Sequence, residues 1–157
     1  MARTPSASHR RTFLRTAGLG AVAVLARPGR ADAAELTAAE QANVKVVDDM
    51  CAAWVAPLDF QKITRFLADD CVYRATETAP PVKGRQAIVE TLQKMLGTSK
   101  SASFEVVQTF ARGPMVVNER IDRFAMPERS LAWTGIGVFF LKNGKIVEWS
   151  DYTISMK

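Results

Sequence analysis

The feature that most limits the fold is a run of four strand-like segments in the second half of the chain. These segments cover residues 104–111, 115–125, 130–141 and 146–154, and they are rich in Val, Ile, Phe, Trp and Thr. Such residues favour β-strands, and short turn-forming stretches separate the segments. The Asn143-Gly144 pair in the last turn is typical of a tight hairpin. The pattern predicts an antiparallel meander.

The strand-like segments follow a part of the chain that is mostly helical in pattern. Apolar residues recur every three or four positions from 36 to 54, which predicts an amphipathic helix. Thr37 is its expected N-cap, because Glu40 completes a capping-box pattern. Further elements are expected in this order: a short helix from Asp59 to 67, a turn at Asp69-Asp70, a strand at 71–75, a loop at 76–83 and a helix from Gly84 to 96. Helices followed by strands indicate an α+β fold, with N-terminal helices packed on a curved, mostly antiparallel sheet.

The first 33 residues have the pattern of an export signal. The paired Arg10-Arg11 precede Phe-Leu, an apolar run follows at 17–26, and the stretch ends in Ala31-Asp32-Ala33. This order is typical of a secretory signal, and the paired arginines resemble a twin-arginine signal, which exports folded proteins. We therefore expect cleavage of residues 1–33, a periplasmic location and one mature domain over residues 34–157. A disordered basic N-terminus is the alternative.

The positive charge of the chain belongs to this leader. The whole chain has a formal net charge of +5, but the leader holds six arginines and one acidic residue, so the remainder is formally neutral. Nucleic-acid binding needs a basic surface, so no nucleic-acid partner is expected. The apolar run of the leader is too short to cross a bilayer about 30 Å thick. No stable membrane association is therefore expected after cleavage.

Two residue types that are common in enzyme active sites are scarce here. The only histidine, His9, lies in the leader, so the mature domain has none. Its absence excludes Ser-His-Asp and Cys-His catalysis and every metal site that uses histidine. The two cysteines, Cys51 and Cys71, cannot form a four-cysteine site. A disulfide between them and two buried free thiols are both open.

One expected strand carries charges where a core strand would carry apolar residues. Alternation places four side chains on one face: Asn118, Arg120, Asp122 and Phe124. If this face met solvent, Arg120 and Asp122 would be an ordinary surface pair. In the last strand, however, Asp151 shares a face with Trp149, which favours the concave side of the sheet. We therefore expect Arg120, Asp122 and Asp151 to meet in an apolar pocket.

Two carboxylates around one guanidinium have a chemical use. Unlike environments can separate their proton affinities, which gives one ionised base and one protonated acid at neutral pH. The arginine keeps its proton and can hold both carboxylates through its fork of donors. The base can then activate water while the acid protonates the leaving oxygen. This arrangement favours the addition of water to a strained, polarised bond.

Several short motifs occur in a characteristic order. They are Arg120-Ile121-Asp122, Gly137-Val138-Phe139, Asn143-Gly144-Lys145-Ile146 and Trp149-Ser150-Asp151-Tyr152, with the stretches 66–73 and 80–85 upstream. Their order and spacing resemble limonene-1,2-epoxide hydrolase over roughly residues 42–153. The resemblance implies a cone-shaped α+β fold like that of nuclear transport factor 2, and a homodimer. It also implies hydrolysis in one step, without a covalent enzyme intermediate, a metal or another cofactor.

The resemblance further implies roles for individual residues. Asp122 would be the base that takes a proton from water, and Asp151 the acid that protonates the epoxide oxygen. Arg120 would bridge the two carboxylates, and Tyr73 would help to hold the water. Three aromatic residues would bind a small apolar substrate: Phe124, Trp149 and Phe139.

The chain departs from the family pattern at Ala75, where the family has an asparagine that also holds the water. Asn118 is the one candidate replacement on the face of Asp122, although it lies about 13 Å away along the strand. The departure keeps open a second interpretation, non-catalytic binding of a hydrophobic small molecule. A third is an isomerase or cyclase of the ketosteroid or polyketide type. The second carboxylate favours hydrolysis over that chemistry, which needs an oxyanion donor instead.

Overall fold

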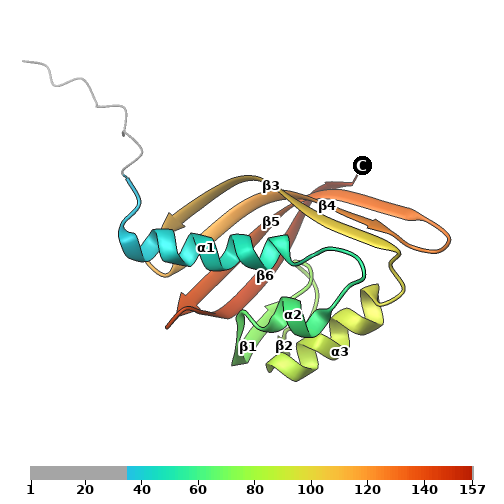
Figure 1. Cartoon of the computed structure of the whole chain (residues 1–157), viewed down its shortest axis with the longest axis horizontal. Helices are drawn as coiled ribbons and strands as arrows, with labels where there is room; N and C mark the ends of the chain where they lie inside the picture. The colour runs from blue at the N-terminus through green and yellow to red at the C-terminus, as the bar shows by residue number, and fades with distance from the viewer. Residues whose placement is uncertain (1–34, 157) are drawn as a thin grey trace, which may run out of the picture. The chain divides into compact units, whose positions relative to one another are not determined.

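The computed structural model describes residues 35–156, so the signal predicted for residues 1–33 lies outside the described residues. The described chain forms three helices and six strands. In chain order they are α1 (Ala38–Ala52), α2 (Phe60–Thr64), β1 (Leu67–Arg74), β2 (Val82–Lys83), α3 (Arg85–Leu96), β3 (Ser101–Arg112), β4 (Met115–Ala125), β5 (Ser130–Lys142) and β6 (Lys145–Met156). Figure 1 shows α1 lying along the sheet, with α2 and α3 near β1 and β2.

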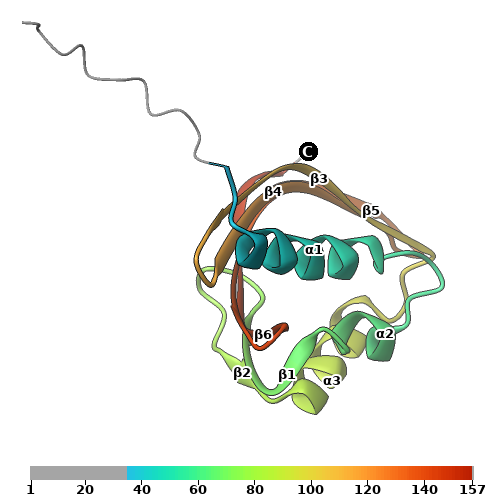
Figure 2. The ribbon, with the colours of Figure 1, turned by 60° about the vertical axis from the view of Figure 1, so that its left-hand side comes forward.

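The six strands form one sheet in the order β2-β1-β6-β5-β4-β3. Strands β3 to β6 are the expected antiparallel meander, and the parallel pairing of β1 with β6 is the exception. Figure 2 shows the sheet curving around α1 without closing on itself. The predicted α+β fold, with N-terminal helices on a curved, mostly antiparallel sheet, is confirmed.

The first helix begins where the capping-box pattern predicts. The Thr37 side chain accepts a hydrogen bond from the backbone N–H of Glu40, and the Glu40 carboxylate accepts one from the backbone N–H of Thr37. Glu40 also accepts a hydrogen bond from the backbone N–H of Gly113, at 2.7 Å. This contact ties the start of α1 to the β3–β4 turn. The later turns of α1 bury Val47 and Met50 in the core between helix and sheet.

Two local predictions around β1 are wrong. Asp69 and Asp70 lie inside β1 and not in a turn, because the strand already begins at Leu67 and pairs there with Ile146 of β6. The register between β1 and β6 shifts after Leu67, which is where the two polar residues fall. Val82–Lys83, expected in a loop, pairs with β1 as the edge strand β2.

Both cysteines are free and buried. Burial raises the pKa of Cys51 to about 11 and that of Cys71 to about 12. Thiols with such pKa values are almost entirely protonated at neutral pH, and buried thiols of this kind are unreactive. Of the two alternatives left open by the sequence, the structure therefore shows free thiols.

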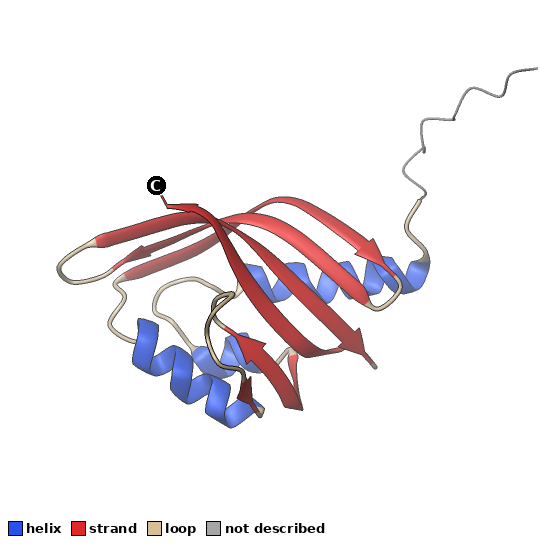
Figure 3. Ribbon diagram, turned by 180° about the vertical axis from the view of Figure 1, so that it is seen from behind, coloured by secondary structure: helices blue, strands red, loops and turns tan. Residues whose placement is uncertain are grey.

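Some apolar side chains of the sheet are exposed to solvent. Phe110 on β3 is 60% exposed and Ile154 on β6 is 59% exposed. Figure 3 views the molecule from behind, with α1 passing behind the strands. The homodimer expected from the resemblance stays a prediction. No helix among residues 35–156 is long and apolar enough to span a membrane.

Candidate functional site

The charged face of β4 points into the concave side of the sheet. Burial alternates along the strand, and Asn118, Arg120 and Asp122 are all at most 1% exposed. The alternative of an ordinary surface pair is therefore wrong. Buried charges are costly unless they are paired and hydrogen-bonded, so their partners decide whether this arrangement is stable.

Arg120 is the centre of a buried hydrogen-bond network. Its Nε donates to Asp122 Oδ1 at 2.8 Å, and its Nη2 donates to Asp151 Oδ1 at 2.6 Å. Its Nη1 donates to the side-chain oxygen of Asn118 at 3.1 Å. The Phe104 ring lies against the guanidinium, 4.6 Å from ring centroid to Cζ. Two carboxylates thus flank one guanidinium, as the strand alternation predicts.

The strand register explains how residues 31 positions apart come together. Both β4 and β6 pair with β5, which lies between them. Asn118 of β4 and Asp151 of β6 are both opposite Gly137 of β5. The three positions form one row across the sheet, and their side chains share its concave face. Asp151 therefore lies within reach of the Arg120 side chain.

Each carboxylate has one oxygen committed to this network. Asp122 Oδ1 accepts from Arg120, and Asp151 Oδ1 accepts from both Arg120 and the Trp149 indole N–H, at 2.8 Å. The Trp133 side chain also hydrogen-bonds the Asp122 carboxylate and helps to lower its pKa against the effect of burial. Asp151 Oδ2 accepts no hydrogen bond from the described residues that carry the network, so this oxygen is left for water or a ligand. The Asp151 side chain is 17% exposed and forms the more open side of the centre.

Burial and neighbouring charge shift the pKa values of the centre upward. Burial raises the pKa of Asp122 to about 6; Arg120 opposes this shift and Asp151 adds to it. Burial also raises the pKa of Asp151 against the opposing effect of Arg120. Burial alone would lower the pKa of Arg120, but Asp151 and Asp122 outweigh it and raise that pKa. Arg120 therefore stays charged at neutral pH, while both aspartates bind a proton more tightly than exposed ones do.

These charges form one wall of an apolar pocket of about 240 Å³. Arg120, Asp122 and Asp151 all line it. Its apolar lining comes from strands β3, β4 and β5, from helix α3 and from the loop after β1. The lining residues are Ala75, Met95, Leu96, Phe104, Phe124 and Trp133. A few convergent polar groups in an apolar cavity are the usual composition of a small-molecule site.

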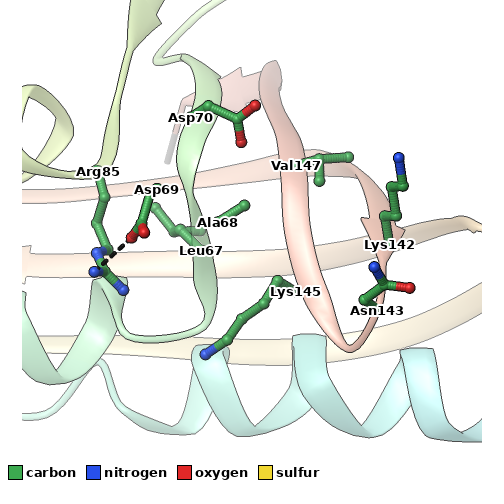
Figure 4. Close-up of a pocket in the computed structure, with 9 residues that line it drawn as sticks. All are labelled: Leu67, Ala68, Asp69, Asp70, Arg85, Lys142, Asn143, Lys145 and Val147. Carbon is green, nitrogen blue, oxygen red and sulfur yellow. Dashed lines mark ion pairs between the residues drawn. The ribbon is translucent and has the colours of Figure 1, made fainter.

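A larger hollow of about 480 Å³ lies elsewhere, beside β1 and the β5–β6 turn (Figure 4). Its lining includes Asp69, Arg85 and Lys145. Asp69 and Arg85 form an ion pair at 2.6 Å, but their side chains are 87% and 41% exposed. Exposed pairs of this kind contribute little to stability. The smaller pocket, which contains the buried charges, is therefore the candidate site.

The structure divides the predicted site residues into those that line the pocket and those that are buried beside it. Phe124 lines the pocket together with Arg120, Asp122 and Asp151. Tyr73, Trp149 and Phe139 are buried and form an aromatic stack beside the charges, with Trp149 4.2 Å from Tyr73 and 6.1 Å from Phe139 between ring centroids. None of these three lines the pocket. Trp149 instead fixes Asp151 by its indole hydrogen bond, and the substrate-binding roles of Trp149 and Phe139 stay predictions.

Sequence reasoning missed two aromatic walls of the pocket. Phe104 of β3 and Trp133 of β5 are both opposite Asp122 in the sheet register. Counting outward from the turn between β4 and β5 gives the position of Trp133, so that signal was present. The same count from the turn between β3 and β4 puts Glu105 opposite Asp122, and only the register shift between Val106 and Gln108 brings Phe104 there. Asn118 has a different place from the one considered for it: its side chain contacts Arg120 and Cys51 rather than the pocket. Asn118 therefore does not replace the asparagine that is missing at Ala75.

Comparison with known proteins places this geometry in context. Residues 47–149, about two thirds of the chain, match the model of the SnoaL-like domain. The structure is similar to an LEH-like epoxide hydrolase from M. tuberculosis, with 25% identity, a TM-score of 0.61, and coverage of 73% of this chain and 84% of that chain.

Two further solved structures share the fold at lower identity. Bal32a, from a soil-derived mobile gene cassette, is 16% identical with a TM-score of 0.63, and the match covers 74% of this chain and 92% of that one. A protein with a ketosteroid isomerase-like fold from Catenulispora acidiphila, solved with trimethylamine, is 15% identical with a TM-score of 0.61. That match covers 69% of this chain and 84% of the other.

Proposed function

The chain belongs to the SnoaL-like domain family, and from this premise we propose that it hydrolyses an epoxide on a small apolar substrate to a diol. One observation carries the proposal: Arg120 holds Asp122 and Asp151 together on the wall of an apolar pocket. The similarity to an LEH-like epoxide hydrolase supports it. Hydrolysis needs a base and an acid on the two sides of the reacting bond, and this centre offers one carboxyl for each role.

In the proposed reaction Asp122 takes a proton from water while the water oxygen attacks one epoxide carbon. The bond between that carbon and the epoxide oxygen breaks, and the oxygen takes a proton from Asp151. The diol then leaves with Asp122 protonated and Asp151 ionised, and exchange of one proton restores the starting state. A pKa of about 6 leaves Asp122 largely ionised at neutral pH but more basic than an exposed aspartate. The raised pKa of Asp151 favours its protonated form.

Two other residues support this reaction. Arg120 stays charged, so the same guanidinium orients both carboxylates throughout the proton transfers. Tyr73 is buried beside the centre, and burial, together with Asp151, raises its pKa well above the usual range. Its hydroxyl therefore keeps its proton at neutral pH. Because Tyr73 does not line the pocket, its contact with the attacking water, which the resemblance implies, stays a prediction.

The pocket indicates the class of substrate. Its lining is mostly apolar apart from the charged wall, and its volume of about 240 Å³ lies below the range of roughly 300–1,000 Å³ typical of drug-sized ligands. We infer a compact hydrocarbon skeleton that carries one epoxide. A panel of terpene and styrene oxides, assayed for diol formation with the purified protein, tests the proposal. No diol from any member of the panel would count against it.

Ala75 gives a gain-of-function prediction. Ala75 lines the pocket, and an asparagine there could donate to the attacking water. Ala75→Asn is therefore expected to raise kcat on an accepted epoxide several-fold, since one added hydrogen bond is worth about 1 kcal/mol. Ala79→Asn, in the same loop but outside the pocket lining, is the control. Steady-state kinetics on the same epoxide measure both variants.

The same variant separates the enzyme from a binding protein. Ala75 itself favours this second candidate function, because a poorly held water slows catalysis without weakening apolar binding. If neither the natural chain nor Ala75→Asn forms diol, while an apolar ligand raises the melting temperature of both, non-catalytic binding replaces hydrolysis as the function.

We also propose that the protein is exported to the periplasm after folding. The paired Arg10-Arg11 motif supports this, and so do the free, buried thiols of Cys51 and Cys71, which fit a chain that folds before it meets an oxidising compartment. Replacing both arginines by lysine is expected to leave an uncleaved precursor in the cytoplasm. Cell fractionation and the mass of the product measure this. Unchanged export of the double variant would rule out the twin-arginine route.

A further inference from the structure

The Arg120 side chain crosses a neighbouring strand to reach its second carboxylate. Arg120 belongs to β4 and Asp151 to β6, with β5 between them. Adjacent strands lie about 4.8 Å apart, so β4 and β6 are about 10 Å apart. A residue with an ordinary side chain on the concave face of β5 would stand in the way of the guanidinium. The bridge from Arg120 to Asp151 therefore depends on what β5 carries at that point.

Gly137 of β5 leaves the space that the guanidinium occupies. A Cβ atom added at Gly137 would overlap Arg120 Nη1 and would lie 2.7 Å from the side-chain oxygen of Asn118. The backbone of Gly137 is not in the left-handed region, so its conformation alone does not require glycine. Glycine inside a strand marks a close approach of another group. Here the nearest group is the Arg120 guanidinium, and the Phe139 ring also lies 2.7 Å from the same Cβ position.

Asn118 holds Nη1 of the guanidinium, the one nitrogen that does not donate to a carboxylate. Its side-chain oxygen accepts from Arg120 Nη1 at 3.1 Å, and its side-chain NH₂ donates to Cys51 Sγ at 3.4 Å. Asn118 is completely buried and Cys51 is 2% exposed. The weak acceptor on Cys51 orients the amide so that its oxygen faces the arginine. With Nη1 held in this way, Nε and Nη2 are directed at Asp122 and Asp151.

We propose that Asn118 and Gly137 are positioning residues, which fix the Arg120 guanidinium so that it holds Asp122 and Asp151 in register. The inference rests on the proposed function for its effect on turnover, but the geometry it describes can be tested without turnover. The two residues touch neither pocket nor substrate, because neither lines the pocket. They act only through Arg120.

This positioning has a consequence for the proton affinities in the centre. Four titratable groups face Asp122: Arg120 from its own strand, Asp151 from β6, Tyr73 from β1 and Cys51 from α1. Of these only Arg120 is a cation, and it lowers the pKa of Asp122 against the effect of burial. A displaced guanidinium would lower that pKa less. The carboxyl of Asp122 would then titrate at higher pH.

Two variants and a matched control test the proposal. Asn118→Leu keeps the approximate volume and removes the acceptor for Arg120, and Gly137→Ala places a methyl group where Nη1 lies. Val138→Ala changes the next residue of β5, whose side chain points to the other face of the sheet. Circular dichroism and thermal melting establish that each variant is folded. Carbon-13 NMR of labelled aspartate carboxyls then follows the titration of Asp122 and Asp151, and kinetics on an accepted epoxide give kcat and KM.

The expected result is an upward shift of the Asp122 titration in both variants, and none in Val138→Ala. In kinetics, kcat falls by roughly 10²-fold with little change in KM, and the acidic limb of the pH–rate profile moves to higher pH. An unchanged Asp122 titration in a folded Asn118→Leu protein would overturn the proposal, even if Gly137→Ala does not fold. If the natural chain turns over no epoxide, the proposed function fails, and the NMR titrations still decide the positioning roles.

Discussion

Asp122→Asn and Asp151→Asn are each expected to lower kcat by roughly 10²–10⁴-fold, while the protein stays folded. Asparagine has the shape of aspartate but neither takes nor gives a proton at neutral pH. In the proposed reaction, Asp122→Asn therefore removes the base that activates water, and Asp151→Asn removes the acid that protonates the epoxide oxygen. Both amides can still accept a hydrogen bond from Arg120, so the bridge that Arg120 makes at 2.8 and 2.6 Å can persist in part.

Glu119→Gln is the matched control for these two variants. Glu119 lies on β4 immediately before Arg120, but its side chain points to the outer face and accepts a hydrogen bond from Gln108. It is expected to keep normal turnover. Near-normal kcat in either aspartate variant would remove that residue from the chemistry.

The proposed activity of the natural protein should also be lost in acid with a defined midpoint. Asp122 acts as a base only when ionised, and its pKa is raised to about 6. The value of kcat/KM is therefore expected to fall as the pH drops below about 6, and the Asp122→Asn variant should lack this limb. A limb near pH 4, where an exposed aspartate titrates, would show that burial does not shift the base.

Arg120→Met is expected to lower the free energy of unfolding by about 3–5 kcal/mol at neutral pH. Methionine fills much of the same space but leaves Asp122 and Asp151 without their cation. Asp122 is 1% exposed, so its charge cannot be compensated by water in the folded state. Loss of one partner from a buried ion pair is costly for this reason, and chemical unfolding at constant pH measures it.

The pH dependence of this loss has a definite sign. Burial already raises the pKa of Asp122 from 3.8 in the unfolded chain to about 6 in the folded one, and removal of Arg120 raises it further. A carboxyl with a raised folded pKa adds stability below its unfolded pKa and loses that contribution as the pH rises through the folded pKa. The deficit of Arg120→Met should therefore shrink as the pH falls from 7 toward 4. A deficit that is the same at both pH values would contradict the account.

Arg120→Lys is the matched control, because it keeps the positive charge and removes the forked N–H donors of the guanidinium. A lysine ammonium keeps the cation but cannot direct three separate N–H groups at Asp122, Asp151 and Asn118 in fixed geometry. It is expected to recover part of the stability that Arg120→Met loses, and little of the turnover.

The placement of the charged centre could be predicted from local pattern. Strand alternation is a period of two, so Arg120 and Asp122 had to share a face, and Asp151 had to share one with Trp149. Short turns limit the register between neighbouring strands of the meander. They also place β5 between β4 and β6, so β6 is the second strand from β4. The start of α1 was predictable for the same local reason, because Thr37 and Glu40 lie within one helical turn.

Long-range pairing could not be predicted in this way. The strand β1 pairs in parallel with β6, 79 positions later at Leu67 and Ile146, and no turn chemistry links them. Asp69 and Asp70 therefore looked like a turn, although pairing holds them in a strand. The place of Asn118 was missed because its partners include Cys51 on a distant helix. Met95 and Leu96 reach the pocket only through the packing of α3 beside β1, which no local pattern reports.

The central claim is that Asp122 activates water directly and forms no ester with the substrate. A single-turnover reaction in ¹⁸O-water, with enzyme in excess over an accepted epoxide, tests this claim. The account predicts that the diol of the first turnover already carries one ¹⁸O atom from solvent, and that Asp122 and Asp151 carry none when the protein is digested and weighed. First-turnover diol with an unlabelled oxygen from the enzyme, and ¹⁸O in an aspartate afterwards, would contradict it.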